Sequence, residues 1–253
     1  AVGEAIVIEC ARVLAGLVAS GKMKRPDCSI RFMVGTEHTA LTVYFSRRAD
    51  SINETLAGVN LDTTAFDCER FYNPNEVKLS ASASPSAYDS LYLQAVAAST
   101  RRHLRNPTYK VVSSHLGDDC FLSDPYYRIP MYWFSTPSGR HWHNNHNRFK
   151  HIVPAKVQMA VERDLAFACI IAGLEATTVD SLVEDSKRPG ETRVGVGVVR
   201  QQRQRVVATE HNRRERPGSR RSVPEHPLVV VVARSGAELH LVLGHDGLQD
   251  DVH

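Results

Sequence analysis

The sequence predicts an α/β fold, a three-layer sandwich in which helices cover both faces of a mixed, mostly parallel sheet. Two observations carry this prediction. Stretches with apolar residues at helical spacing alternate with short apolar runs that are typical of buried strands. The resulting order is helix, strand, helix, strand, helix, strand, strand, helix, and such alternation is typical of layered α/β domains.

The first part of the chain supplies two helices and two strands. Residues 4–20 place apolar side chains on one helical face, and Gly21 is the expected C-cap. The run "CSIRFMV" is a predicted strand, and "EHTALTVYFSRRA" after it has the apolar spacing of a helix. The run "LAGVNLD" is a second strand that ends at the polar Asp62.

The second part completes the domain and is followed by a change in composition. Residues 85–104 and 154–174 are predicted helices that each have a proline near the start, and "YKVVSS" and "IPMYWFS" are strands between them. We expect one domain over residues 1–175. Residues 176–253 are predicted to form a basic linker, in which "LVVVVARSGAELHLVLG" is a candidate β-hairpin.

Composition narrows the class of protein. The apolar runs are too short to cross a bilayer, so no membrane span is predicted. Five irregularly spaced cysteines indicate free, mostly buried thiols rather than a disulfide framework or a cysteine-based zinc finger. The net charge of +3 is small. The basic stretch 187–221 has no interleaved aromatics, so a solvated linker is favoured over a nucleic-acid site.

Four polar residues that follow predicted strands are candidates for chemistry, namely Glu37, His38, Asp62 and His143. Imidazole and carboxylate groups are the usual ligands of a catalytic zinc, and a further carboxylate can take a proton from metal-bound water. Each residue also has an ordinary explanation. Asp62 can cap the next segment, Glu37 can favour a helix start, and the histidines can be surface or loop residues.

An aromatic cluster lies near these candidates in the chain and has two interpretations. It consists of Tyr126, Tyr127, Tyr132, Trp133 and Phe134. Its side chains could line a pocket for an apolar side chain of a ligand, but residues of a predicted strand more often belong to the core. We favour the core interpretation for the strand residues.

Five short motifs, in order over residues 1–174, resemble the co-catalytic zinc aminopeptidases of the aminopeptidase Y and transferrin-receptor-like group. The motifs are the helix in "AVGEAIVIECARVLAGL", the strand and acidic pair in "SIRFMVGTEHTAL", "GVNLDTT", "GDDCFLSDPYYRIPMYWF" and the histidine loop "HWHNNHNRF". The resemblance implies a zinc aminopeptidase-like fold, two zinc ions and a peptide substrate.

The resemblance also implies roles for individual residues. Glu37 matches the general base, and His38, Asp62 and His143 match metal ligands. Asp118 and Asp119 lie in the loop where the family has Ser-Asp-His, and Trp142 precedes His143 where a tyrosine is common. We expect these three residues to contact substrate, the indole N–H of Trp142 as an oxyanion donor.

The chain also departs from the family. The sequence starts at the family's Ala-Ser-Gly turn, so we expect the domain to lack its N-terminal part, which carries two further metal ligands. His38 replaces a carboxylate, and Ala40 replaces a glycine. The expected activity is hydrolysis of N-terminal peptide bonds. The alternative is a catalytically silent aminopeptidase-like fragment that serves as a binding module, and a third class is a nucleic-acid-associated protein that acts through its basic tail.

Overall fold

The computed structural model describes residues 2–68, 75–105, 108–112, 118–136 and 148–174, the positions 178 and 182, and the backbone of 228–234. The helices are α1 (Val2–Ala19), α2 (Thr39–Arg47), α3 (Asp50–Glu54), α4 (Asp89–His103) and α5 (Pro154–Ala172), with 3-10 turns η2 (Asp118–Ser123) and η4 (Phe149–His151). The strands are β1 (Ser29–Gly35), β2 (Thr55–Asn60), β3 (Asn75–Lys78), β4 (Tyr109–Val112), β5 (Met131–Ser135) and β6 (Leu228–Arg234).

The strands form one six-stranded mixed sheet in the order β1-β6-β2-β5-β3-β4. β1, β6, β2 and β5 run parallel to one another, and β3 pairs with β5 in the antiparallel sense. β4 runs parallel to β3. The predicted α/β class and the mixed, mostly parallel sheet are therefore confirmed, and the carboxyl ends of β1, β2 and β5 lie at the same edge.

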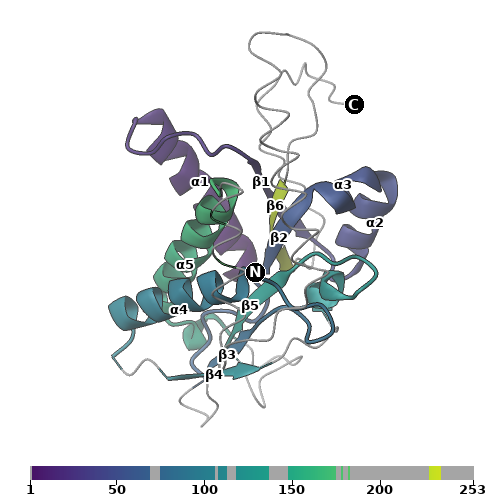
Figure 1. Ribbon diagram of the computed structural model, residues 1–253. Coiled ribbons are helices and arrows are strands. Elements are labelled where there is room, and N and C mark those ends of the chain that lie inside the picture. The colour runs from purple at the N-terminus through teal and green to yellow at the C-terminus, as the bar shows by residue number, and fades with distance from the viewer. Residues whose placement is uncertain are drawn as a thin grey trace, which may run out of the picture.

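Helices cover both faces of this sheet. α1, α4 and α5 lie together on one side, and α2 and α3 lie on the other (Figure 1). β5 explains why both faces need a cover, since successive side chains of a strand point to opposite faces. Tyr132 and Phe134 belong to the larger core beneath α1, α4 and α5, whereas Met131 and Trp133 belong to a smaller core with α2 and η2.

Local sequence signals account for several element ends. α1 ends at Ala19, and Gly21 has a φ of 69°, in the left-handed region that favours glycine after a helix. Pro154 opens α5 at a position where its missing N–H costs nothing. The five cysteines are free, and Cys169 alone among them is not fully buried. These features agree with the sequence predictions.

Four elements differ from the predictions. β3 and α3 have no counterpart among them, and the helix predicted from Glu37 begins at Thr39. The strand predicted as half of a hairpin, β6, instead lies between β1 and β2 and pairs with both. The sheet therefore contains a strand from beyond residue 175, where we predicted a basic linker with a candidate β-hairpin outside the domain. The other half of that hairpin, residues 237–243, lies outside the described residues.

Candidate functional site

The junction between β1 and α2 contains a strained turn at His38. The Thr39 N–H donates to the Glu37 carbonyl at 2.6 Å, which closes a three-residue γ-turn around His38. His38 has a φ of 60° and a ψ of −44°. Positive φ is costly for a residue with a side chain, and such outliers concentrate at functional sites.

Close packing at the end of β1 positions this turn. A Cβ atom on Gly35 would lie 2.3 Å from the Cβ of Ala40, far inside contact distance. The strand and the first turn of α2 can approach this closely because Gly35 has no side chain. Gly35 therefore accommodates Ala40, five residues later.

The side chains of the turn are open to solvent and adjacent. The His38 side chain is half exposed and the Glu37 side chain a quarter exposed, and His38 Nε2 lies 3.9 Å from Glu37 Oε1. The imidazole also packs against the ring of Phe121, with 5.6 Å between centroids. A carboxylate and an imidazole are thus presented side by side at the carboxyl edge of the sheet, as predicted.

Asp119 joins this turn from η2, a distant part of the chain. Its Oδ1 accepts a hydrogen bond from the His38 backbone N–H at 2.8 Å, and the residue is 2% exposed. Burial raises the pKa of Asp119 to about 6, an effect that the His38 bond opposes and the charges of Asp118 and Glu37 reinforce. The strand β4 that precedes η2 ends at the opposite edge of the sheet, yet Asp119 reaches the Glu37 side.

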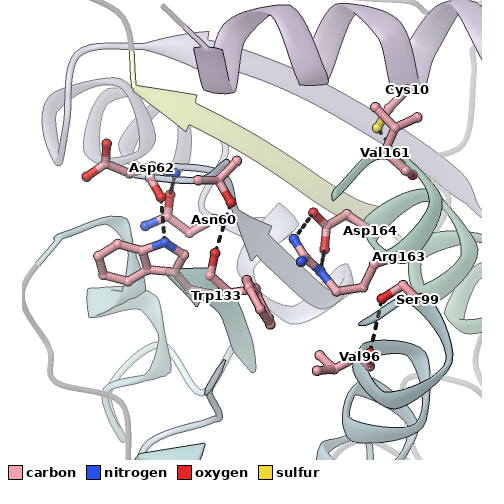
Figure 2. A network of polar contacts seen from close by, with 11 residues as sticks. Cys10, Asn60, Asp62, Val96, Ser99, Trp133, Val161, Arg163 and Asp164 are labelled. Atoms are coloured by element: carbon pink, nitrogen blue, oxygen red, sulfur yellow. Dashed lines mark hydrogen bonds and ion pairs between the residues drawn. The ribbon is translucent and has the colours of Figure 1, made fainter. Parts of the chain in front are cut away.

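Asp62 follows β2 at the same edge. The indole N–H of Trp133 donates to its carbonyl oxygen at 2.6 Å, and its own N–H donates to Asn60 Oδ1 at 3.0 Å (Figure 2). One carboxylate oxygen accepts the Thr63 N–H at 2.7 Å. The Asp62 side chain therefore does stabilise the following turn, in line with the capping interpretation.

Lys78, at the end of β3, is a residue of this region that sequence reasoning missed. Its Nζ lies 3.4 Å from the centroid of the Trp133 ring, and the residue is 6% exposed. Burial lowers its pKa, and the negative charges of neighbours including Asp118 and Asp62 oppose that change. The short segment "EVKL" is half charged, so no pattern in the sequence could have found it.

Not every predicted site residue can be placed. His143 and Trp142 lie within 137–147, outside the described residues. Glu37, His38, Asp118 and Asp119 come together, and Asp62 and Asp118 both act electrostatically on Lys78. The turn after β1 therefore meets η2 through Asp119, and Asp62 and Asp118 share Lys78 as a neighbour.

The described residues do not by themselves make a zinc site. The donor groups of Glu37, His38 and Asp62 are of the right chemical type. Within the described part of the chain, however, no three His, Cys, Asp or Glu side chains are grouped closely enough to hold a metal ion. Zinc binding therefore stays a prediction that depends on His143.

The aromatic cluster divides as its two interpretations suggested. Tyr132, Trp133 and Phe134 are buried in the core, which confirms the interpretation of the strand residues. Tyr126 is 82% exposed, and its ring contacts Tyr127, with centroids 5.0 Å apart. Tyr127 in turn packs edge-on against Phe121, the ring beside His38.

A second polar feature, in the opposite layer, belongs to the core rather than to the site. Arg163 and Asp164 of α5 are both fully buried and form a bidentate pair, with Arg163 Nε 2.7 Å from Asp164 Oδ1 (Figure 2). The guanidinium also lies over the ring of Phe134. The two charges neutralise each other inside the core, although Arg163 Nη1 has no hydrogen-bond partner among the described residues, and we assign the pair a structural role.

Comparison with known proteins places the chain in no family. The chain matches no protein-family model, no curated protein and no solved structure. No helix in the described residues is long and apolar enough to span a membrane.

Proposed function

We propose that this protein is a hydrolase that cleaves N-terminal peptide bonds, with Glu37 as the general base. The observation that carries the proposal is the strained γ-turn at His38, which presents Glu37 and His38 side by side at the carboxyl edge of the sheet. Ligands of open α/β sheets bind at this edge. A chain retains such strain only where the surrounding structure enforces it, and functional sites are the usual place.

The geometry suits proton transfer by Glu37. Its side chain is partly open to solvent, so a water molecule can reach the carboxylate. A base in this position takes a proton from the attacking water and returns it to the leaving amine. The neighbouring imidazole of His38 can orient that water by a hydrogen bond. The resemblance to zinc aminopeptidases adds a zinc ion to the proposal, with His143 as one of its ligands.

The substrate class follows from the surface beside His38. Phe121, Tyr127 and Tyr126 form a row of ring contacts that leads away from His38 to the exposed surface. An aromatic row of this kind can bury an apolar side chain of a peptide. Peptides with an apolar first residue are therefore the substrates to test first.

A second candidate function is a catalytically silent peptide-binding module. The observation that favours it is the buried ammonium of Lys78, held over Trp133 and within electrostatic reach of Asp62 and Asp118. This internal cation neutralises carboxylates that would otherwise attract metal ions. Such a module would bind the same peptides and leave them intact.

Hydrolysis of leucine and phenylalanine p-nitroanilides by the full chain, with added zinc and with a chelator, tests the proposal. Glu37→Gln should lower the rate roughly 10²–10⁴-fold, the usual contribution of a general base. Glu9→Gln is the matched control, since Glu9 pairs with Arg12 on the surface of α1 and should leave the rate unchanged.

Two outcomes would contradict the proposal. Full activity of Glu37→Gln would remove the residue from the mechanism. If the wild-type chain hydrolyses no aminoacyl substrate under any of these conditions, but binds an apolar peptide in a calorimetric titration, the silent module replaces the enzyme.

A further inference from the structure

The turn at His38 needs an external partner to keep its conformation. A φ of 60° is unfavourable for histidine. The hydrogen bond from the Thr39 N–H to the Glu37 carbonyl stabilises the turn only weakly, because the N–H···O angle of a γ-turn is bent. The backbone N–H of His38 precedes α2, so it has no partner within the helix. Asp119, 81 residues later, accepts it at 2.8 Å.

Asp119 is itself firmly held. Its backbone N–H donates to Asp118 Oδ1 at 3.0 Å, and Asp118 has a φ of 67°, a second left-handed residue facing the first. Cys120 and Leu122, the following residues, are buried in the smaller core. The hydroxyl of Ser123 accepts the Met131 N–H at 2.9 Å, which ties the end of η2 to β5.

We infer that Asp119 is a positioning residue that holds the Glu37–His38 turn in its strained form. This inference assigns Asp119 a different task from the substrate contact expected from the sequence. A carboxylate that is 2% exposed and already bound to the His38 N–H has little surface to offer a substrate. We call the hydrogen bond from the His38 N–H to Asp119 the clamp. The effect of the clamp on catalysis rests on the proposed function, but the clamp itself does not.

The clamp explains why the adjacent side chains stay together. With the His38 N–H fixed, the γ-turn directs the imidazole towards Phe121 and leaves it 3.9 Å from the Glu37 carboxylate. Without the acceptor, residues 36–39 can relax to ordinary helical or extended backbone. Glu37 and His38 would then lose their fixed relative placement, and a base misplaced by about 1 Å loses much of its effect.

The test compares hydrogen exchange at the His38 amide, followed by NMR, in three variants and the wild type. Asp119→Ala removes the acceptor, and Asp119→Asn keeps an acceptor oxygen at the same position. Asp124→Ala is the matched control, because Asp124 Oδ1 accepts the Tyr126 N–H at 2.8 Å in the same loop without touching the turn. We expect the His38 amide to exchange roughly 10-fold faster in Asp119→Ala, the scale of one charge-assisted hydrogen bond. Asp119→Asn and Asp124→Ala should stay within a few-fold of the wild type.

Hydrolysis then separates this inference from the proposed function. If the protein is an enzyme, Asp119→Ala should lower kcat with little change in KM, and Asp119→Asn should restore most of it. If the His38 amide exchanges faster in Asp119→Ala but the wild type hydrolyses no substrate, the clamp is supported and the proposed enzymatic function is overturned. A His38 amide that is unprotected in the wild type overturns the clamp, and this measurement needs no variant to fold. Equal exchange in Asp119→Ala and wild type overturns it as well.

Discussion

Asp89 should make the stability of this protein depend on pH. Its side chain is 2% exposed at the start of α4, where it accepts hydrogen bonds from the hydroxyls of Ser80 and Tyr132, both at 2.9 Å. Burial raises its pKa to about 6, although these hydrogen bonds favour the charged form. We predict that ionisation of Asp89 destabilises the fold and that Asp89→Asn removes this effect.

The sign and the size of this pH effect on the free energy of unfolding follow from the difference in the pKa of Asp89 between the folded and the unfolded chain. Because the folded pKa is raised, the stabilisation is fully present below the ordinary value of 3.8 and is lost as pH rises through about 6. At about 1.36 kcal/mol for each pKa unit, the loss amounts to roughly 3 kcal/mol. Because some of this loss has already occurred at pH 4, the free energy of unfolding should fall by roughly 2.4 kcal/mol between pH 4 and pH 7 through Asp89 alone.

Urea unfolding at a series of pH values, followed by circular dichroism, measures the effect. Asp119 has a pKa raised in the same direction, so the wild-type profile alone cannot isolate Asp89. The informative quantity is the stability of the wild type minus that of Asp89→Asn, which should decrease by roughly 2.4 kcal/mol from pH 4 to pH 7. Asp50→Asn, at an exposed aspartate, is the control. A difference that stays constant over this range would refute the reasoning.

Two further predictions concern packing and buried charge. Gly35→Ala should lower the free energy of unfolding by about 1–3 kcal/mol in a urea titration, since its Cβ would clash with Ala40, and adding Ala40→Gly should restore most of the loss. If the double variant is no more stable than the single one, that contact is not the cause. Asp164→Ala should cost roughly 3–5 kcal/mol in the same titration by leaving the Arg163 guanidinium buried and unpaired. A cost no larger than that of Glu9→Ala, at an exposed pair, would contradict this.

Residues whose surroundings are set by their chain neighbours could be predicted from the sequence. Apolar runs that stop at Glu37 and Asp62 indicated strands with polar ends, and parallel strands bring such ends to one edge. The structure places both residues there. The same reasoning located the helix caps at Gly21 and Pro154, because those residues act on their own backbone.

β6 shows where a strand could be predicted from the sequence but its place in the sheet could not. A run of four valines is continuous rather than alternating, which is typical of a central parallel strand buried on both faces. A hairpin with one open face would alternate apolar and polar residues. The hairpin interpretation rested on the junction at Ser235 and Gly236, which says nothing about the position of a strand in a sheet.

The remaining parts of the site depend on partners that are distant in sequence. Asp119 meets the His38 backbone across 81 residues, and the Trp133 indole meets Asp62 across 71. Lys78 is placed by register, since it stands opposite Trp133 in the antiparallel pair of β3 and β5. β3 has only four residues, and half of them are charged, so no apolar pattern predicts this strand.

The left-handed backbone of the site was hidden for a related reason. Histidine and aspartate adopt positive φ more often than most residue types, but this preference is too weak to single out His38 and Asp118 in the sequence. The conformation exists because η2 and the start of α2 hold each other, each supplying what the other lacks: an acceptor from Asp119 and a donor from His38. The acidic pair Asp118–Asp119 in η2 and the Glu37–His38 pair therefore form one structural unit. Only the folded chain brings these two segments into contact.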